Sequence, residues 1–99
     1  MVLKLYNFGL YRSMKFEFDP AKSAANKDKH GLDFVEAQKL WTDPALVTAP
    51  ARTEGEPRSI AIAFMDGAYW SAIFTLRGAN IRLISVRRSR QEEIENYEN

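Results

Sequence analysis

The sequence contains no cysteine, so it has no disulfide bond, no thiol nucleophile and no cysteine-based metal site. It contains one histidine, His30, and a metal site built on this residue is not expected because no second histidine or cysteine can join it. No apolar run approaches the roughly 18 residues that a membrane-spanning helix needs. We therefore expect a cytoplasmic protein that has no contact with a membrane.

The composition fits a small folded domain. Ninety-nine residues suit one domain, and a 45% hydrophobic content suits a chain with one modest core. The net charge is only +1, but the charges are separated along the chain: residues 77–90 hold five arginines and no acid, whereas residues 91–99 hold four glutamates and no base. A near-neutral chain can thus present a basic face that attracts a phosphate-rich partner.

The first thirteen residues precede a second methionine, Met14. They lack the apolar length and the cleavage region of a signal peptide. They could form an extra edge strand, but we favour an extension, either a disordered arm or the product of an upstream start site. We predict a single domain over residues 14–99.

Alternating residues, helix caps and turn residues predict the order of the elements within this domain. The predicted elements are a strand at 14–18, helices at about 20–30 and 34–41, strands at about 46–50, 58–65, 69–77 and 80–87, and a C-terminal helix. Asp19 and Gly31 are the expected caps of the first helix. Asp33 and Glu36 have the spacing of a capping box for the second helix, and Ser89 is the expected cap of the last one.

This order predicts an α+β domain whose last four strands form an antiparallel meander. We expect the helices to pack on one face of the sheet. The other face would then stay open to a partner.

The predicted strand NIRLISVRR, residues 80–88, combines apolar residues with arginines. Strict alternation puts Arg87 on the face of Leu83, and Arg82 on the opposite face with Val86. An arginine near the strand end could bind an anion such as phosphate. Alternatively, these arginines form a solvated edge or pair with the C-terminal glutamates. The pattern leaves both interpretations open.

Lys29 and His30 fall in the last turn of the first predicted helix. Cations at this position interact favourably with the helix dipole. His30 could instead transfer protons, since the pKa of histidine lies near neutrality.

Four other side chains are candidates for binding or chemistry. Glu56 and Arg58, in the segment GEPR, form either a weak surface ion pair or a carboxylate and a guanidinium at the rim of a cleft. Trp70 and Tyr97 are interpreted as packing residues rather than as platforms for nucleic-acid bases.

Several motifs occur in a recognisable order. They are KFEFDPAK (15–22) with Asn26, KHG (29–31), DFVEA (33–37), DP (43–44), GEPR (55–58), RLISVRR (82–88) and E-x-x-x-Y (93–97). Together they resemble BrnT, a family of toxins from bacterial type II toxin–antitoxin pairs within the broader RelE/ParE-like superfamily. Phe18 and Val86 depart from the tryptophan and alanine that are common in that family.

The resemblance implies a RelE-like fold and a ribonuclease that inhibits translation without a metal or another cofactor. It also implies a ribbon–helix–helix antitoxin, a heterotetrameric complex with it and binding of that complex to operator DNA. If the chain cleaves RNA, the 2′-OH of the substrate attacks the adjacent phosphorus. The candidate residues are His30 and Glu56 for proton transfer, Lys29, Arg58, Arg82 and Arg87 for charge stabilisation, and Tyr97 as a further acid. The alternative is a non-catalytic protein or co-repressor that docks a partner through its basic face.

Overall fold

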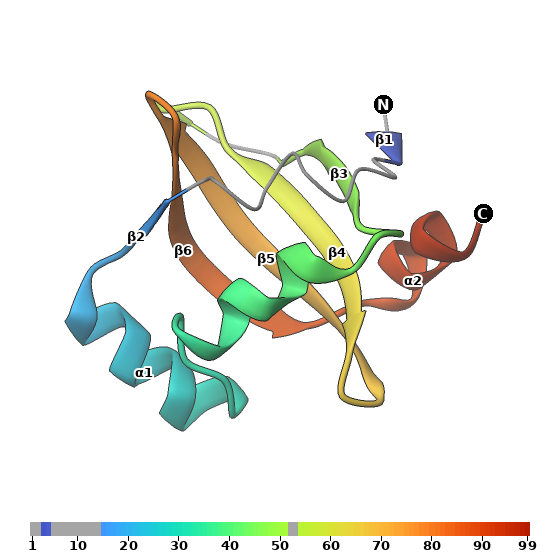
Figure 1. Ribbon diagram of the computed structural model, residues 1–99, viewed down its shortest axis with the longest axis horizontal. Coiled ribbons are helices and arrows are strands. Elements are labelled where there is room, and N and C mark those ends of the chain that lie inside the picture. Colours follow the sequence, from blue (N-terminus) through green and yellow to red (C-terminus); the bar gives the residue numbers. More distant parts are fainter. Residues whose placement is uncertain (1–2, 5–14, 52–53) are drawn as a thin grey trace.

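The computed structural model of the protein describes residues 3–4, 15–51 and 54–99. The elements in chain order are β1 (Leu3–Lys4), β2 (Phe16–Glu17), α1 (Pro20–His30), η1 (Glu36–Thr42), β3 (Val47–Pro50), β4 (Ser59–Met65), β5 (Ala68–Arg77), β6 (Asn80–Arg88) and α2 (Gln91–Glu98). Figure 1 shows a strongly twisted sheet with α1 and η1 along one side and α2 near the C-terminus. The predicted α+β class is confirmed.

The sheet has the strand order β1-β3-β4-β5-β6-β2. β3, β4, β5 and β6 pair antiparallel in sequence order, and each of their boundaries lies within one residue of the prediction. β2 adds a parallel pair to β6, and β1 pairs antiparallel with β3. Apart from β1, the first thirteen residues lie outside the described part of the chain, so the domain boundary at Met14 stays a prediction.

The helix caps explain where α1 and η1 begin and end. The Asp19 side chain accepts a hydrogen bond from the Ala21 N–H, and Gly31 ends α1 with a φ of 84°, a conformation that glycine adopts without steric cost. Asp33 and Glu36 each accept a hydrogen bond from the other's N–H, as the capping-box spacing predicts. The segment that follows is a 3₁₀ helix, not the α-helix over 34–41 that we expected.

A β-bulge in β6 changes which residues share a face of the sheet. Ile73 pairs with Ser85, but Phe74 pairs with Leu83, so Ile84 has no partner on β5. The buried positions of β6 accordingly shift from Leu83 to Val86, an interval of three residues.

The prediction from strict alternation is therefore wrong beyond Ile84. After the bulge, Val86 and Arg88 continue the face of Leu83. Arg87 lies on the opposite face, and it is Arg82, before the bulge, that shares this face with it.

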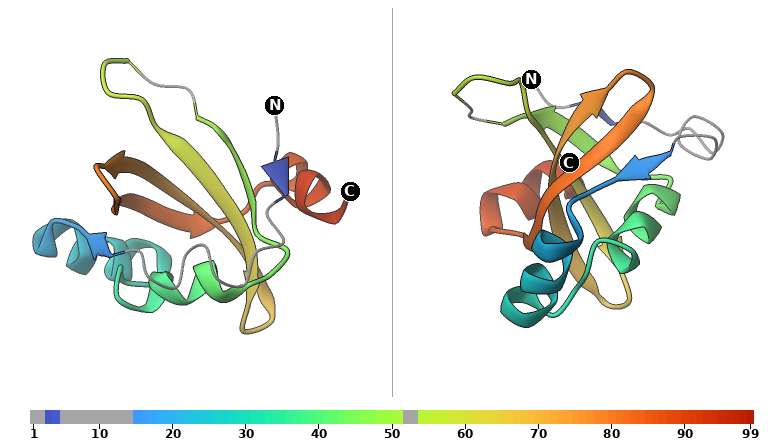
Figure 2. Two further views of the ribbon diagram at one scale, coloured as in Figure 1. Left: turned by 45° about the horizontal axis from the view of Figure 1, so that its top comes forward. Right: turned by 90° about the vertical axis from the view of Figure 1, so that its left-hand side faces the viewer.

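The two faces of the sheet have separate apolar layers. The main core lies under α1 and η1, where Trp41 packs edge-on against Phe74 with the ring centroids 5.4 Å apart. On the opposite face, Val47 and Ile62 are 0% and 1% exposed and pair across β3 and β4. α2 packs against β4 on this second side, as the right-hand view of Figure 2 shows.

The expectation that all helices share one face is thus wrong for α2. Ser71 lies on the face opposite Phe74, and its hydroxyl donates a hydrogen bond to Glu93 of α2. Ser89 is also not the N-cap of α2 that we predicted, because Arg90 occupies that position. The hydroxyl of Ser89 instead lies 2.7 Å from that of Ser71.

Asn26 joins α1 to the outer edge of β6. β2 pairs only with the first part of β6, so the backbone of Val86 faces no strand on that side. The Asn26 side-chain amide donates to the Val86 carbonyl at 2.8 Å and accepts from the Val86 N–H at 3.1 Å. It also donates to the Leu32 carbonyl at 2.7 Å, so one buried amide replaces part of a missing strand.

We expect Asn26→Asp to destabilise the protein by about 3 kcal/mol, because a buried carboxylate would face two carbonyl oxygens without a donor of its own. Urea denaturation monitored by tryptophan fluorescence would measure the change. Asn96→Asp is the matched control: Asn96 is exposed in α2, and its replacement should change stability by about 0.5 kcal/mol or less. Equal effects of the two substitutions would contradict this role of Asn26.

Candidate active site

One end of the sheet gathers three arginines and a carboxylate from three segments, namely the loop before β4, β5 and β6. We call Glu56, Arg58, Arg77 and Arg82 the arginine end. The loop before β4 is fixed there because the Thr75 hydroxyl of β5 donates to the Pro57 carbonyl at 2.7 Å. Arg77, the last residue of β5, lies 3.4 Å from the Glu56 carboxylate. Both side chains are about half exposed, so this pair contributes little to stability.

Arg82 enters the arginine end from β6. Its guanidinium lies 3.3 Å from Glu17 of β2, and Glu17 also accepts a hydrogen bond from Asn80 at 3.1 Å. The bond from Asn80 is the main cause that lowers the pKa of Glu17, and Arg82 lowers it further against the opposing effect of burial. About a third of each side chain remains exposed, so an incoming phosphate can compete with Glu17 for Arg82.

Among the described residues, Arg58 is the arginine of this end that has no ion-pair partner. Its carbonyl accepts a hydrogen bond from the Ala51 N–H, which extends the β3–β4 ladder by one step. Its side chain is exposed, and within the described part of the chain it has no ion-pair or hydrogen-bond partner. The arginine end therefore offers three guanidinium groups to an anionic ligand, and the carboxylate of Glu56 lies beside them.

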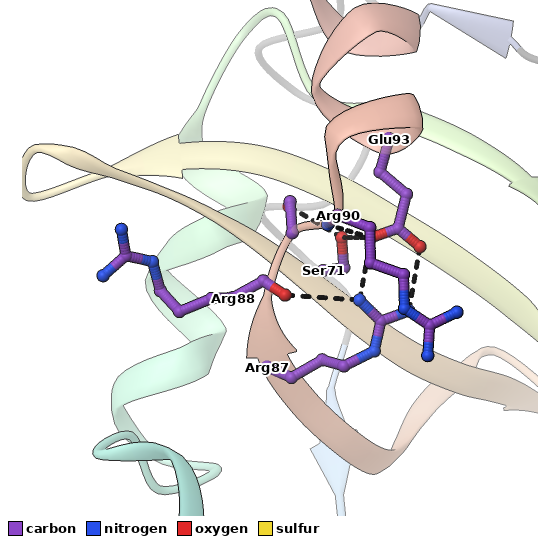
Figure 3. A network of polar contacts seen from close by, with 6 residues as sticks. Ser71, Arg87, Arg88, Arg90 and Glu93 are labelled. Atoms are coloured by element: carbon purple, nitrogen blue, oxygen red, sulfur yellow. Dashed lines mark hydrogen bonds and ion pairs between the residues drawn. The ribbon is translucent and has the colours of Figure 1, made fainter.

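Arg87 lies elsewhere, in a nearly buried ion pair with Glu93. Two guanidinium nitrogens of Arg87 contact the two carboxylate oxygens of Glu93, each at 2.8 Å, which is a bidentate geometry. Ser71 and the Arg90 N–H donate further hydrogen bonds to the same carboxylate (Figure 3). This network attaches α2 to the sheet. Of the two interpretations of the β6 arginines, pairing with a C-terminal glutamate is the one that applies to Arg87.

The network sets the charge state of Glu93. Burial is the largest single influence and would raise the pKa of this carboxyl group. The hydrogen bonds from Arg87, the Arg90 backbone and Ser71 together outweigh burial and lower the pKa of Glu93 to about 2. Glu93 in turn raises the pKa of Arg87 through their hydrogen bonds, so the pair stays ionised across the physiological range.

The remaining predicted residues do not join the arginine end. Lys29 and His30 close α1, and the views in Figures 1 and 2 separate α1 from the loop of residues 54–58. The Tyr97 hydroxyl donates to Asp43 at 2.8 Å, which links α2 to the end of η1. Arg82 and Arg87 are five residues apart on β6, or about 17 Å.

The geometry thus groups Glu56 and Arg58 with Arg82 and leaves the other candidates apart. No pair of His30 and Glu56 is formed. Sequence reasoning missed Arg77 and Glu17, whose contacts depend on strand pairing, and it missed the particular glutamate that binds Arg87. The capping-box spacing in the sequence selects Ser89 and Glu92 instead, so this local signal points to the wrong glutamate.

Comparison with known protein families identifies a family over most of the chain. Residues 18–93 match the family described as "Ribonuclease toxin, BrnT, of type II toxin-antitoxin system". The chain belongs to the BrnT family. It is thus a toxin-family protein of the ribonuclease type, and the motifs that suggested this family all lie within or next to the matched residues. No curated protein sequence matches the chain.

Two further findings concern the described residues of this BrnT-family chain. Among residues 3–4, 15–51 and 54–99, no three His, Cys, Asp or Glu side chains gather into a group that could hold a metal ion. Across the same residues, no helix has the length and apolarity to span a membrane.

We expect Glu93→Gln to destabilise the protein by about 2 kcal/mol at pH 7, because it removes the charged acceptor of Arg87. The folded-state pKa of Glu93, about 2, lies below the ordinary value of 4.5. Its stabilisation is therefore complete above pH 4.5 and is lost as the pH falls toward 2. Urea denaturation at pH 7 and pH 3 should show that the difference in free energy of unfolding between wild type and variant is smaller at pH 3.

Glu92→Gln is the control for this experiment. Glu92 is the exposed neighbour in the first turn of α2, and its substitution removes the same charge without touching Arg87. It should shift stability by about 0.5 kcal/mol or less. A Glu93→Gln gap that is as large at pH 3 as at pH 7 would mean that the carboxylate does not carry the stabilisation.

Proposed function

We propose that this BrnT-family toxin is an endoribonuclease that cleaves RNA at the arginine end by attack of the 2′-OH, without a metal ion. The observation that supports the site is the contact of Glu56 with Arg77, next to the exposed Arg58 and the weakly paired Arg82. An RNA phosphate needs cations, and its 2′-OH needs a proton acceptor. This end of the sheet offers both from fixed backbone positions.

In this mechanism the roles follow from charge and position. Glu56 accepts the proton of the 2′-OH, which frees the oxygen to attack the adjacent phosphorus. Arg58 and Arg82 stabilise the negative charge that develops on the phosphorane oxygens, since guanidinium groups bind two such oxygens at once. The leaving 5′ oxygen takes its proton from water in this mechanism. His30 and Tyr97, which the sequence offered for this step, lie on α1 and α2 apart from Glu56, and Tyr97 already donates its hydroxyl to Asp43.

We further propose that a ribbon–helix–helix antitoxin neutralises the toxin, that the pair forms a heterotetramer and that this complex binds operator DNA. Family membership supports an antitoxin partner. The sheet face that carries α2 offers a surface for it, because the apolar side chains of Ile60 and Ile73 pair across β4 and β5 there and are only partly buried. In the second candidate function, the same basic residues dock a partner and no RNA is cleaved.

The decisive experiment is cleavage of end-labelled RNA by the purified protein in EDTA, without ribosomes. We expect Glu56→Gln to lower the cleavage rate by about 10²-fold, as for a general base, and Arg58→Ala and Arg82→Ala to lower it by 10²-fold or more. RNA binding by Glu56→Gln should stay close to that of the wild type. His30→Gln should remain within about tenfold of wild type, because α1 lies apart from the loop that carries Glu56.

Lys22→Ala serves as a control, since Lys22 is an exposed cation on α1. If Glu56→Gln retained wild-type cleavage, the arginine end would lose its proposed base. If the loss occurred in His30→Gln instead, the site would move to α1. A folded protein that binds RNA but never cleaves it, with or without ribosomes, would favour the docking function.

A further inference from the structure

We propose that Arg88, whose guanidinium lies over the Trp70 ring, is a second RNA contact of this toxin and binds the RNA at a point away from the cleavage site. The inference rests on the proposed ribonuclease function. It assigns an RNA-binding role to an arginine outside the candidate active site and makes Trp70 more than a packing residue. Arg88 would contribute to binding rather than to the chemical step.

The contrast between Arg87 and Arg88 is the first observation. The two arginines are neighbours in β6 and point to opposite faces of the sheet. Arg87 is occupied, because it makes two hydrogen bonds to Glu93. Arg88 points away from this ion pair, as Figure 3 shows. It is exposed, and no carboxylate of the described residues pairs with it.

The contact with Trp70 is the second observation. Trp70 and Arg88 are direct partners across β5 and β6, and the guanidinium carbon of Arg88 lies over the Trp70 ring, 5.5 Å from its centroid. Trp70 packs against the main core, which holds the ring in place. The cation–π contact holds the guanidinium over the ring, so Arg88 loses less freedom when it binds a ligand than a free arginine would.

This arrangement suits a nucleotide. The Arg88 guanidinium lies over the indole and is exposed to solvent, so an RNA base could stack on its outer side. Its N–H groups can at the same time donate to a phosphate. A platform of this kind accepts any base, because every base has a π face.

More positive charge lies close to Arg88. Asn26 binds α1 to Val86, two residues before Arg88. Lys29 and His30 follow Asn26 by one turn, so they share its side of α1. Neither has a hydrogen-bond or ion-pair partner among the described residues. Lys29 adds a positive charge to this region.

Arg82 of the arginine end and Arg88 lie six residues apart on β6, about 20 Å along the strand, and on opposite faces of the sheet. An RNA strand that contacts both must therefore pass around the edge of the sheet. Arg88 would bind nucleotides on the face that carries α1 and not those at the cleaved bond.

The test uses the full-length protein and a fluorescent single-stranded 2′-O-methyl RNA, which cannot be cleaved by 2′-OH attack. Arg88→Ala should weaken binding about tenfold, and the slope of log K against log salt should fall in magnitude by about 0.7, the value for one lost phosphate contact. Arg88→Lys keeps the charge but not the planar stack, so it should restore the slope but only part of the affinity. In cleavage of ordinary RNA, Arg88→Ala should raise KM and leave kcat within about twofold.

Lys22→Ala provides the control for loss of one exposed cation, and it should change affinity by less than about twofold. An Arg88→Ala variant with wild-type affinity and salt slope would overturn the inference. So would a variant that binds normally and loses kcat. If Arg88→Ala weakens binding in a protein that never cleaves RNA, the RNA contact stands and the ribonuclease function fails. If the wild-type protein does not bind RNA, both fail.

Discussion

The β-bulge at Ile84 is the constraint on which the rest of the structure depends. One extra residue in β6 rotates the strand, so that Leu83 and Val86 both face the main core although three residues separate them. The same rotation places Arg87 beneath α2 and Arg88 beside Trp70. Without the bulge, Val86 would leave the core and Arg87 would replace it there, where a charge without a partner is costly.

The polar side chains of β6 and its neighbours divide between two tasks. Asn26 and Glu93 are almost fully buried, and their hydrogen bonds attach α1 and α2 to opposite sides of the same strand. Such groups stabilise the fold because every donor and acceptor is satisfied. Arg58 and Arg88, by contrast, keep their charge exposed. Exposed arginines such as these can bind a phosphate backbone without first breaking a strong internal contact.

Much of the fold follows from local sequence, whereas the candidate site follows only in part. Asp19, Gly31 and the pair Asp33–Glu36 act within a few residues, so their caps were predictable. The grouping of Glu56 with Arg82 depends on strands that are distant in the chain, because β4, β5 and β6 must pair in register before the loop and Arg82 lie at the same end of the sheet. A single unpaired residue in that ladder reverses the faces of all residues that follow, and alternation cannot reveal it.

The sequence by itself determined the α+β class, the strand boundaries and the family, since these depend on hydrophobic periodicity and on ordered motifs. Only the tertiary structure decided which arginines are free. Residues 77–90 contain five of them with similar local surroundings. The charge of Arg87 is neutralised because α2 folds back so that Glu93 contacts it. Arg88 faces the opposite side of the sheet and does not contact Glu93. The physical reason is that an ion pair requires contact within about 4 Å, and such contacts are formed by packing rather than by position in the chain.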